Sequence, residues 1–298
     1  MEVNRATLAG LNTSFNTIFN NALGGVQPTW NKVAMEVPST TRENDYRWLG
    51  KLKGMREWIG DRVIENVAKD GYKIVNRKFE NTVAVIKDDI EDDQIGIYNP
   101  LVADLGQTAA EHPDELVWSL LGSGFTEACF DGQYFFDTDH PVIGADGSEG
   151  SVSNFAGGAG TAWYLLDASR AIKPLIYQNR RPAQLTSLTD LDDENVFMRD
   201  EFIWGVDARR NAGFGLWQLA YASKQELTAE NYMAARAAMQ GMKGDHGRPL
   251  RLRPTLLVAP PSLEKKGLEV LKAERDAAGA TNVAMGTATL HVEQLLAA

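Results

Sequence analysis

A stretch in which apolar residues recur at helical spacing limits most strongly what this chain can fold into. It predicts one long helix, because Asn99 is a helix-capping residue type and Pro100 is favoured in a first turn. Pro113 lacks an amide hydrogen, so we expect the helix to kink or restart near this residue. Gly122 and Gly124 then end it. The recurring positions are Leu101, Leu105, Ala109, Leu116, Leu120 and Leu121.

The composition is that of a folded, acidic protein. The 298 residues suffice for one large domain or two medium ones, and 44% of them are hydrophobic. A formal net charge of -10 argues against a protein whose main task is to bind nucleic-acid phosphates. Cys129 is the single cysteine, which excludes an intrachain disulfide framework and favours a reducing compartment. Because no apolar run approaches the roughly 20 residues that cross a bilayer, we expect a soluble protein made in the cytoplasm.

The N-terminal segment predicts an amphipathic helix that ends at Gly24 and Gly25. Its polar face is rich in Asn, Ser and Thr, so its intrinsic helix propensity is low and it needs a surface to dock on. Either the rest of this chain or a neighbouring molecule can supply that surface. Residues 27–43 follow without a clear period and predict an extended arm. The apolar stripe of the helix consists of Leu8, Leu11, Phe15, Ile18, Phe19 and Leu23.

A β ribbon is predicted next, built from β-prone runs that turn residues separate. Charged residues interrupt both of its faces, so the ribbon cannot bury itself. Because a two-stranded ribbon is marginally stable alone, it packs either on a partner or on the long helix of its own chain. The expected strands span residues 62–67, 72–79 and 82–87, with turns at Asp70-Gly71 and Glu80-Asn81.

An acidic run after the ribbon suggests a calcium site at first sight. The calcium-loop pattern needs a glycine at its sixth position, but the sixth position counted from Asp88 is Asp93. The sequence therefore favours a solvated acidic segment or an acidic junction between subunits. The run consists of Asp88, Asp89, Glu91, Asp92 and Asp93.

The loop after the long helix holds the candidate metal ligands Asp137, Asp139 and His140, because carboxylate and imidazole groups suit zinc or manganese. Aspartates before Pro141 are also typical of a tight turn, which is the interpretation that we favour. Cys129 together with His140 is a second candidate, as nucleophile and base. No further feature supports that pair, and a buried thiol is the ordinary outcome for a lone cysteine.

Two glycine-rich segments do not match known site motifs. Residues 157–160 lack the G-x-G-x-x-G spacing and predict a flexible linker instead of a phosphate site. Residues 122–124 lack the G-x-S-x-G pattern of a nucleophile elbow. We therefore predict no catalytic residue, no metal site and no bound cofactor.

The second half of the chain predicts strands first and helices later. Residues 162–224 contain the aromatic and β-branched runs typical of strands. Further strands are expected over residues 254–261 and 287–293, the first of them buried. Since helices and strands are segregated instead of alternating, the fold class is α+β.

Two helices are expected in this half. Thr228 is placed to cap a helix that runs through Met242, with Leu227 and Tyr232 spaced for a hydrophobic staple. A second helix begins at the capping residue Ser262 and ends near residues 278–279. Its apolar positions are Leu263, Leu268 and Leu271.

Several long blocks of the sequence are more specific than any short motif. They are VNRATLAGL, VPSTT, WLGKLKGMREWIGDRVIENV, YKIVNRKFENTVAVIKDDIEDDQIGIY, HPDELVWSLL, CFDGQYFFDTDHPV, ARRNAGFGLWQLAYAS and LRPTLLVAPPSLE. With these blocks the chain resembles, over nearly its whole length, the Mu-like phage major head subunits, the T-type major capsid proteins of Mu and Mu-like prophages.

The resemblance implies the tailed-phage capsid fold of the Hong Kong 97 type. In this fold an N-terminal arm and an extended β loop reach neighbouring subunits, and an axial domain meets its copies at the capsomer centre. The implied parts are the arm at residues 1–45, the extended loop with its base strands at 46–87, the peripheral domain with its spine helix at 88–136 and 286–298, and the axial domain at 137–285.

The resemblance also implies a structural protein and not an enzyme. Such a subunit self-assembles into the pentamers and hexamers of an icosahedral head that encloses double-stranded DNA without sequence-specific contacts. Its implied partners are further copies of itself, a separate scaffolding protein, a portal and a possible decoration protein, with no membrane. It is expected in the virion capsid after synthesis in the cytoplasm of the bacterial host.

Two alternatives from other classes remain. A tail or decoration component of a phage would form tubes, rings or trimers instead of closed shells. A metal-dependent hydrolase would use Asp137, Asp139 and His140 and would hold a stoichiometric metal ion.

Overall fold

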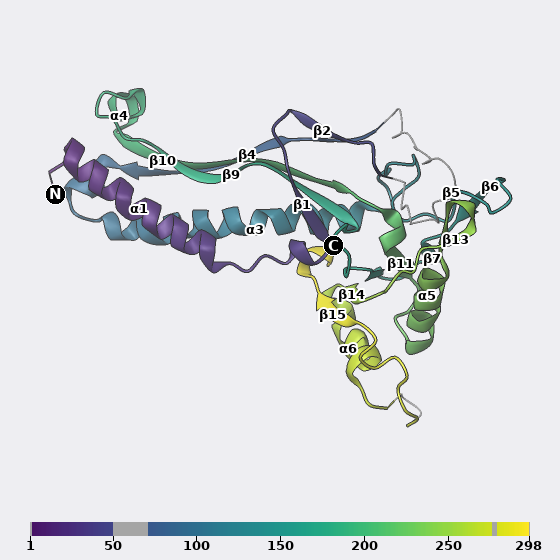
Figure 1. Cartoon of the computed structure of the whole chain (residues 1–298). Helices are drawn as coiled ribbons and strands as arrows, with labels where there is room; N and C mark the ends of the chain where they lie inside the picture. Colours follow the sequence, from purple (N-terminus) through teal and green to yellow (C-terminus); the bar gives the residue numbers. More distant parts are fainter. Residues whose placement is uncertain (1, 50–70, 276–278, 298) are drawn as a thin grey trace.

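The computed structural model describes residues 2–49, 71–275 and 279–297. Figure 1 shows an elongated part, in which two long helices lie along long strands, and a second part with shorter strands and helices. The N-terminus lies at the free end of the elongated part, whereas the C-terminus lies where the two parts meet. The α+β class predicted from the sequence is confirmed, since long helices and sheets occupy separate segments of the chain.

The elongated part contains the predicted N-terminal helix α1 (Arg5–Gly25) and the predicted long helix α3 (Asn99–Ser123). The side chain of Asn4 caps α1 by accepting hydrogen bonds from two backbone amides of the first turn. The helix docks on α3 of its own chain, so the chain itself supplies the surface that the amphipathic pattern requires. The two helices lie closest at Gly106, where an added Cβ would meet the carbonyl oxygen of Phe19 at 2.5 Å.

Helix α3 differs from its prediction at both its start and its centre. Asn99 is its first residue and not its cap, because the short helix η2 (Ile95–Tyr98) leads directly into it, while Pro100 lies in the first turn as expected. The helix does not restart at Pro113 but continues to Ser123. Its buried face is Val102, Leu105, Gly106, Ala109, Pro113, Val117, Trp118 and Leu121, so Leu105, Ala109 and Leu121 are correctly predicted, while Leu101 is exposed and Leu116 and Leu120 are only partly buried.

One long side chain explains how α3 tolerates Pro113. Proline has no amide hydrogen for the carbonyl oxygen four residues earlier, which belongs to Ala109. The guanidinium of Arg210, from the neighbouring sheet, donates to this oxygen over 2.9 Å. Arg210 is 5% exposed, so the bond is buried between helix and sheet. The sheet thereby replaces the hydrogen bond that the helix lacks.

A four-stranded sheet in the order β1-β9-β10-β4 packs on these helices. Its two central strands form a long antiparallel hairpin, and β4 pairs with β10 over its full length. Because β4 continues through Glu80 and Asn81, the predicted turn there is wrong: pairing with β10 overrides the local turn propensity. Residues 27–43 also contain a strand that the predicted extended arm lacked. The bounds are β1 Ala34–Pro38, β4 Arg77–Ile86, β9 Leu175–Leu188 and β10 Glu201–Phe214.

A short hairpin joins the start of β4 to the second part. It consists of β2 (Glu43–Tyr46) and β3 (Tyr72–Val75), which pair antiparallel. The predicted strand over 62–67 and residue 70 of the predicted turn lie outside the described residues.

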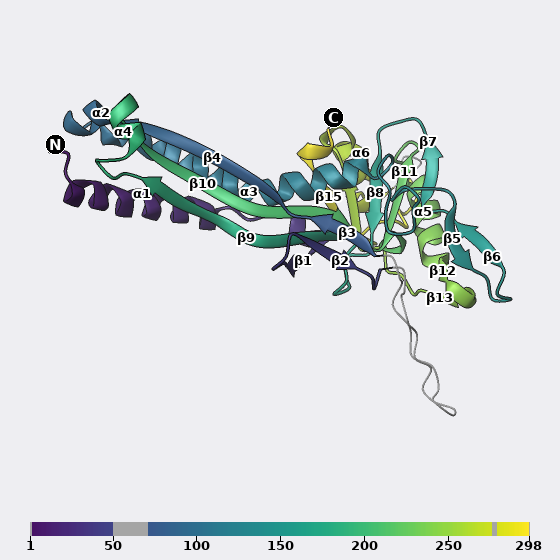
Figure 2. The same ribbon diagram turned by 90° about the horizontal axis from the view of Figure 1, so that it is seen from above.

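Short helices lie at the free end of the elongated part (Figure 2). The predicted acidic run falls mainly in α2 (Lys87–Glu91), and α4 (Glu194–Arg199) connects β9 to β10. A helix is not the alternating loop that calcium coordination needs, in agreement with the failed sequence pattern.

The second part is built on a five-stranded sheet in the order β15-β14-β8-β11-β7. The predicted buried strand at 254–261 and the last predicted strand are both confirmed, as β14 and β15, and they pair in parallel. Residues 157–160 are not a free linker, because two of them belong to β7, which pairs with β11. The bounds are β7 Phe155–Gly158, β8 Trp163–Leu166, β11 Ala220–Lys224, β14 Leu256–Ala259 and β15 Thr289–Val292.

Two helices and two small hairpins complete this part. Helix α5 (Ala229–Gly241) has the predicted Thr228 cap. Helix α6 (Glu264–Lys272) begins after a short 3-10 turn, so Ser262 is not its cap, and it ends earlier than predicted. The hairpins are β5 (His140–Ile143) with β6 (Glu149–Val152), and β12 (Lys243–Gly244) with β13 (Arg248–Pro249).

Among the described residues, buried apolar side chains form two cores, and one of them continues from the second part into the elongated part through Ala34, Trp118 and Ile176. In the elongated part, Phe15 of α1 packs edge-on against Trp204 of β10 with ring centroids 5.0 Å apart. In the second part the core surrounds β8, β11 and β14 and includes Trp163 and Trp217. Among the described residues, no helix combines the length and hydropathy that a bilayer crossing requires.

The pairing of strands divides the chain differently from the boundaries that the resemblance implied. Strands β9 and β10 were assigned to the axial segment 137–285, but they form one sheet with β1 and β4. Strand β15 was assigned with the spine helix, but it hydrogen-bonds to β14 of the axial segment. The cause is that both sheets combine strands far apart in the sequence.

Candidate functional site

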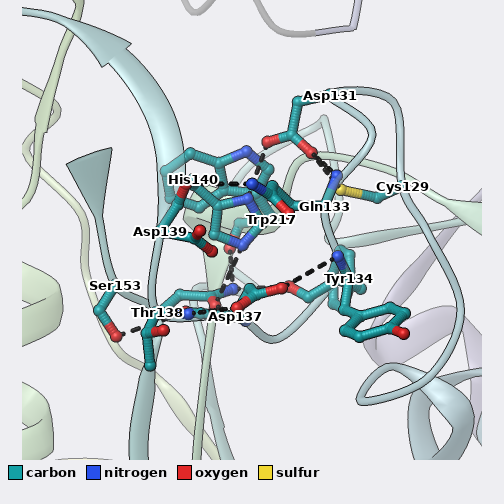
Figure 3. A network of polar contacts seen from close by, with 12 residues as sticks. Cys129, Asp131, Gln133, Tyr134, Asp137, Thr138, Asp139, His140, Ser153 and Trp217 are labelled. Carbon is teal, nitrogen blue, oxygen red and sulfur yellow. Dashed lines mark hydrogen bonds and ion pairs between the residues drawn. The ribbon is translucent and has the colours of Figure 1, made fainter. Parts of the chain in front are cut away.

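The three sequence-predicted metal ligands do not converge (Figure 3). His140 is fully buried at the start of β5, whereas Asp139 is exposed. The carboxylate of Asp137 accepts backbone hydrogen bonds from Tyr134 and Thr138, as in the tight turn that the sequence favoured. A hydrogen bond with Asp137 raises the pKa of Asp139, and the two carboxyls interact with each other more than with His140. The three side chains therefore do not form a ligand set.

His140 instead belongs to a buried polar cluster with Asp131 and Cys129. Its Nδ1 donates to one oxygen of Asp131 over 2.7 Å, and the Cys129 thiol donates to the other oxygen over 3.0 Å. The ring of His140 stacks on Trp217 with centroids 3.9 Å apart. The ligand atoms of the three polar residues lie within 4.8 Å of one another, which is compact enough for a metal ion.

The protonation of this cluster favours a structural role. Burial raises the pKa of the Cys129 thiol, and the adjacent Asp131 carboxylate raises it further, so the sulfur keeps its proton. For Asp131, burial acts to raise the pKa, but the hydrogen bonds from His140 and Cys129 outweigh burial and lower it. A protonated thiol is not a nucleophile. Cys129 and His140 both bind Asp131, so the candidate nucleophile-base pair, which the sequence did not favour, lacks the direct hydrogen bond that it needs.

Asn154 extends the cluster into the neighbouring strands. Its amide donates to the carbonyl oxygen of Phe135 over 2.8 Å, and its side-chain oxygen accepts from the backbone amide of Asp137 over 2.9 Å. The Nε2 atom of His140 lies 3.2 Å from the same oxygen. These contacts hold the loop after α3 against the sheet of the second part.

Sequence reasoning missed Asp131, Asn154 and Trp217 as members of this cluster. They lie in a turn, between β6 and β7, and in a 3-10 helix, so no spacing along the chain connects them. The available signal was the block that contains Cys129 and His140, which carries three aspartates between them, Asp131 being one.

The second candidate site is an exposed surface and not a cleft. The most exposed large apolar side chains of the elongated part are Phe197 (87%) and Met198 (67%), both in α4. Burial alternates along most of β10, so every second residue faces away from the side on which α1 and α3 pack. A protein that buries its polar cluster and exposes such surfaces is suited to bind other proteins.

The comparisons with known proteins agree with this description. The model of the family described as "Mu-like prophage major head subunit gpT" matches residues 8–296. The "Mu-like prophage FluMu major head subunit" of Haemophilus influenzae is 46% identical over 267 residues, covering 87% of each chain. The "Major capsid protein" of Escherichia phage Mu is 44% identical over 289 residues, covering 95% of each chain.

Solved structures give the same result. The subunit in the procapsid of bacteriophage JBD30 superposes with a TM-score of 0.88 at 47% identity, covering 98% of this chain and 100% of that chain. The subunit in the JBD30 capsid superposes with a TM-score of 0.77 at 34% identity, covering 99% and 100%.

The fold and the exposed surfaces therefore define a structural protein of the tailed-phage capsid class, with the fold of the Hong Kong 97 type. Within that class, the chain belongs to the family of Mu-like prophage major head subunits.

Proposed function

We propose that this chain is the subunit that builds the shell of a phage head. Copies associate into pentamers and hexamers, and these close an icosahedral shell around double-stranded DNA. The observation that carries the proposal is the match to the JBD30 procapsid subunit over 98% of this chain. A shell repeats each contact many times, so contacts that are individually weak hold it together collectively.

The geometry of the chain supports this function. Helices α1 and α3 stiffen one face of a long sheet, and the opposite face and the α4 end remain available for contacts with neighbours (Figures 1 and 2). The buried Cys129, Asp131 and His140 cluster serves to fix the loop between the two parts. We propose no catalytic role, and no metal or cofactor, for any residue.

We also propose which segments of this chain form the domains of the Hong Kong 97 fold. The elongated part corresponds to the peripheral domain with α3 as its spine helix, and the second part to the axial domain. Following the strand pairing, we place β9 and β10 with the peripheral domain and β15 with the axial domain. Residues 1–45 and 46–87 keep the proposed names N-terminal arm and extended loop, although their strands β1 and β4 share one sheet with β9 and β10 of the peripheral domain.

Further partners are proposed by analogy with the relatives. One solved JBD30 capsid is described as decorated with minor capsid protein trimers, and its subunit is 33% identical to this chain over 90% of each. We propose a decoration protein for this head too, together with a scaffolding protein and a portal. The packaged DNA is enclosed without sequence-specific contacts, and the protein reaches the virion after synthesis in the host cytoplasm.

Electron microscopy of the expressed chain tests this function. The full chain is produced alone and together with the scaffolding protein of the same phage, and the particles are imaged in negative stain. Closed shells of uniform diameter are expected. Tubes, rings or isolated trimers would instead identify a tail or decoration component.

Metal analysis of the same preparation tests the hydrolase alternative. We expect no stoichiometric metal in the purified chain. Bound metal that disappears in His140→Ala would contradict the assignment of a purely structural role.

A further inference from the structure

Three cationic side chains lie in one row across the sheet of the elongated part. The strand registers place Lys78 of β4 opposite Arg209 of β10, and Arg209 opposite Arg181 of β9. Their neighbours along β10, Ala208 and Arg210, are buried towards the helices. Because side chains alternate between the faces of a strand, the three cations project from the face away from α1 and α3.

Only part of this charge is neutralised within the chain. Arg181 forms an ion pair with Asp207. Among the described residues, neither Lys78 nor Arg209 has an ion-pair partner, and the buried Nε of Arg209 has no hydrogen-bond acceptor. Like charges directly opposite each other on neighbouring strands destabilise a sheet. The row is therefore only partly neutralised within the chain, and its exposed cations can accept anionic groups from outside.

The same chain carries a group of complementary charge on a different surface. Four carboxylates lie within five residues from the end of β9 to the first residue of α4, and the exposed Phe197 and Met198 follow within the same helix. Asp190 has a single ion pair, with Arg5 at 3.7 Å between exposed side chains, which contributes little. This surface, here called the acidic turn, consists of Asp190, Asp192, Asp193 and Glu194.

We infer that the acidic turn of one copy binds the row of Lys78, Arg209 and Arg181 on a second copy. The carboxylates complete the ion pairs that the row lacks, and Phe197 packs on an arginine side chain, which accepts both a carboxylate and an aromatic ring. The acidic turn lies at the free end of the elongated part and the row lies further along the sheet, so the contact joins two copies end to face. The inference rests on the proposed shell, which supplies the second copy.

The surroundings of the row favour a protein over nucleic acid as its occupant. The next row across the sheet, two residues along β10, places Glu80 opposite Asp207. A phosphate backbone that continued along the sheet past the row would meet Glu80, whereas a short acidic turn can end on the cations.

Zero-length cross-linking of assembled shells tests the contact. A carbodiimide joins an amine to a carboxylate that is already in contact with it. Shells made from equal amounts of 15N-labelled and unlabelled chain are treated, digested and examined by mass spectrometry. We expect Lys78 joined to the acidic turn in mixed-isotope peptides from shells and not from unassembled subunits. Lys265, whose side chain is 88% exposed, is the matched control and should not join the acidic turn.

A charge exchange provides the second measurement. Lys78→Glu places a carboxylate opposite Arg209 of its own chain, so the unassembled subunit should be at least as stable as the wild type. The yield of shells should nevertheless fall about tenfold, and combination with Asp192→Lys should recover most of it.

The outcomes separate this inference from the proposed function. If the wild type forms no shells, the proposed function fails. If the wild type forms shells but Lys78 never joins the acidic turn of another copy, or Lys78→Glu assembles normally, only the inference fails. Protection of Lys78 from amine reagents solely in DNA-filled shells would make the row a nucleic-acid contact and would equally overturn the inference.

Discussion

At the scale of single residues, Pro113 removes a backbone hydrogen bond from α3, and Arg210, far along the chain, replaces it. The carbonyl oxygen of Ala109 would remain unpaired inside the protein without the guanidinium of Arg210. The proline was visible in the sequence and its effect on the helix was expected, but its compensation was not. Nothing in the letters around position 210 connects that arginine to the helix.

A double-mutant cycle tests this compensation. Arg210→Met should lower the free energy of unfolding by about 1–3 kcal/mol, because a buried carbonyl loses its donor. In a Pro113→Ala background the alanine amide donates to the same carbonyl, so the same substitution should cost about 1 kcal/mol less. The four proteins are compared by urea unfolding of the unassembled subunit. Strictly additive effects would show that the two residues are not coupled.

His112 lies beside the same arginine, and its titration should be visible in stability. Burial and the charges of Arg210 and Arg77 lower its pKa to about 4, and the buried Nδ1 has no hydrogen-bond partner. Since the unfolded imidazole has a pKa near 6.5, the unfolded chain binds more protons between these values. The stabilisation is therefore complete above pH 6.5 and is lost as pH falls towards 4.

We predict that the unfolding free energies of the wild type and of His112→Gln depend differently on pH. From pH 7 to pH 4.5 the wild type should lose more unfolding free energy than His112→Gln, by at most about 2 kcal/mol because the ring is partly solvated. Urea unfolding at several pH values measures this. Parallel pH profiles for the two proteins would mean that His112 titrates normally in the folded state.

Polar clusters were the least predictable features at this scale. His140 was identified as notable, but its actual partners Asp131 and Asn154 are brought to it by the fold. Local caps were predictable where one side chain acts on its own helix, as for Thr228. Where a preceding 3-10 turn begins the helix, as at Ser262, the same reasoning gave the wrong cap.

At the scale of elements, the close approach of α1 and α3 depends on Gly106. A Cβ at this position would lie 2.5 Å from the carbonyl oxygen of Phe19 and 2.9 Å from Cβ of Ala22. The sequence alone indicates only that this glycine is unfavourable inside a helix. The structure shows that it allows the N-terminal helix to dock.

Matched substitutions test this role of Gly106. Gly106→Ala should destabilise the subunit by about 1–3 kcal/mol, because the helices must move apart. Gly10→Ala, in α1 with nothing within 4 Å of the added carbon, should stabilise it by about 0.5–1 kcal/mol through helix propensity. Thermal and urea unfolding give both values. Equal effects of the two substitutions would refute the packing argument.

Periodicity predicted the helices better than the sheet. Both long helices were predicted because a repeat of about 3.6 residues is a property of the segment itself. The turn at Glu80-Asn81 was predicted from equally local preferences, but these residues lie inside β4 because β10 pairs with it. The second half of β9 is polar, and it forms a strand by pairing with β10.

At the scale of the whole molecule, the two sheets determine how the chain is divided. The four-stranded sheet combines β1 and β4 with β9 and β10, and β9 and β10 lie in the sequence between β8 and β11 of the five-stranded sheet. No cut along the chain therefore separates the elongated part from the second part. The α+β class and the capsid fold were predictable, the latter through the resemblance of long sequence blocks. The boundaries implied by that resemblance do not follow the strand pairing, because pairing between distant segments leaves no mark in either segment alone.

At one end of the elongated part, α4 exposes the large apolar side chains Phe197 and Met198. Substituting them tests assembly separately from folding. Phe197→Ser with Met198→Ser should change the unfolding free energy by less than about 0.5 kcal/mol, because both side chains are solvent-exposed in the single chain. In a shell the same side chains meet a neighbour, so sedimentation and electron microscopy should show fewer shells. Val283→Ser, at an equally exposed residue of the second part, is the comparison. Shells at wild-type yield from the α4 variant would place the contacts between copies elsewhere on the molecule.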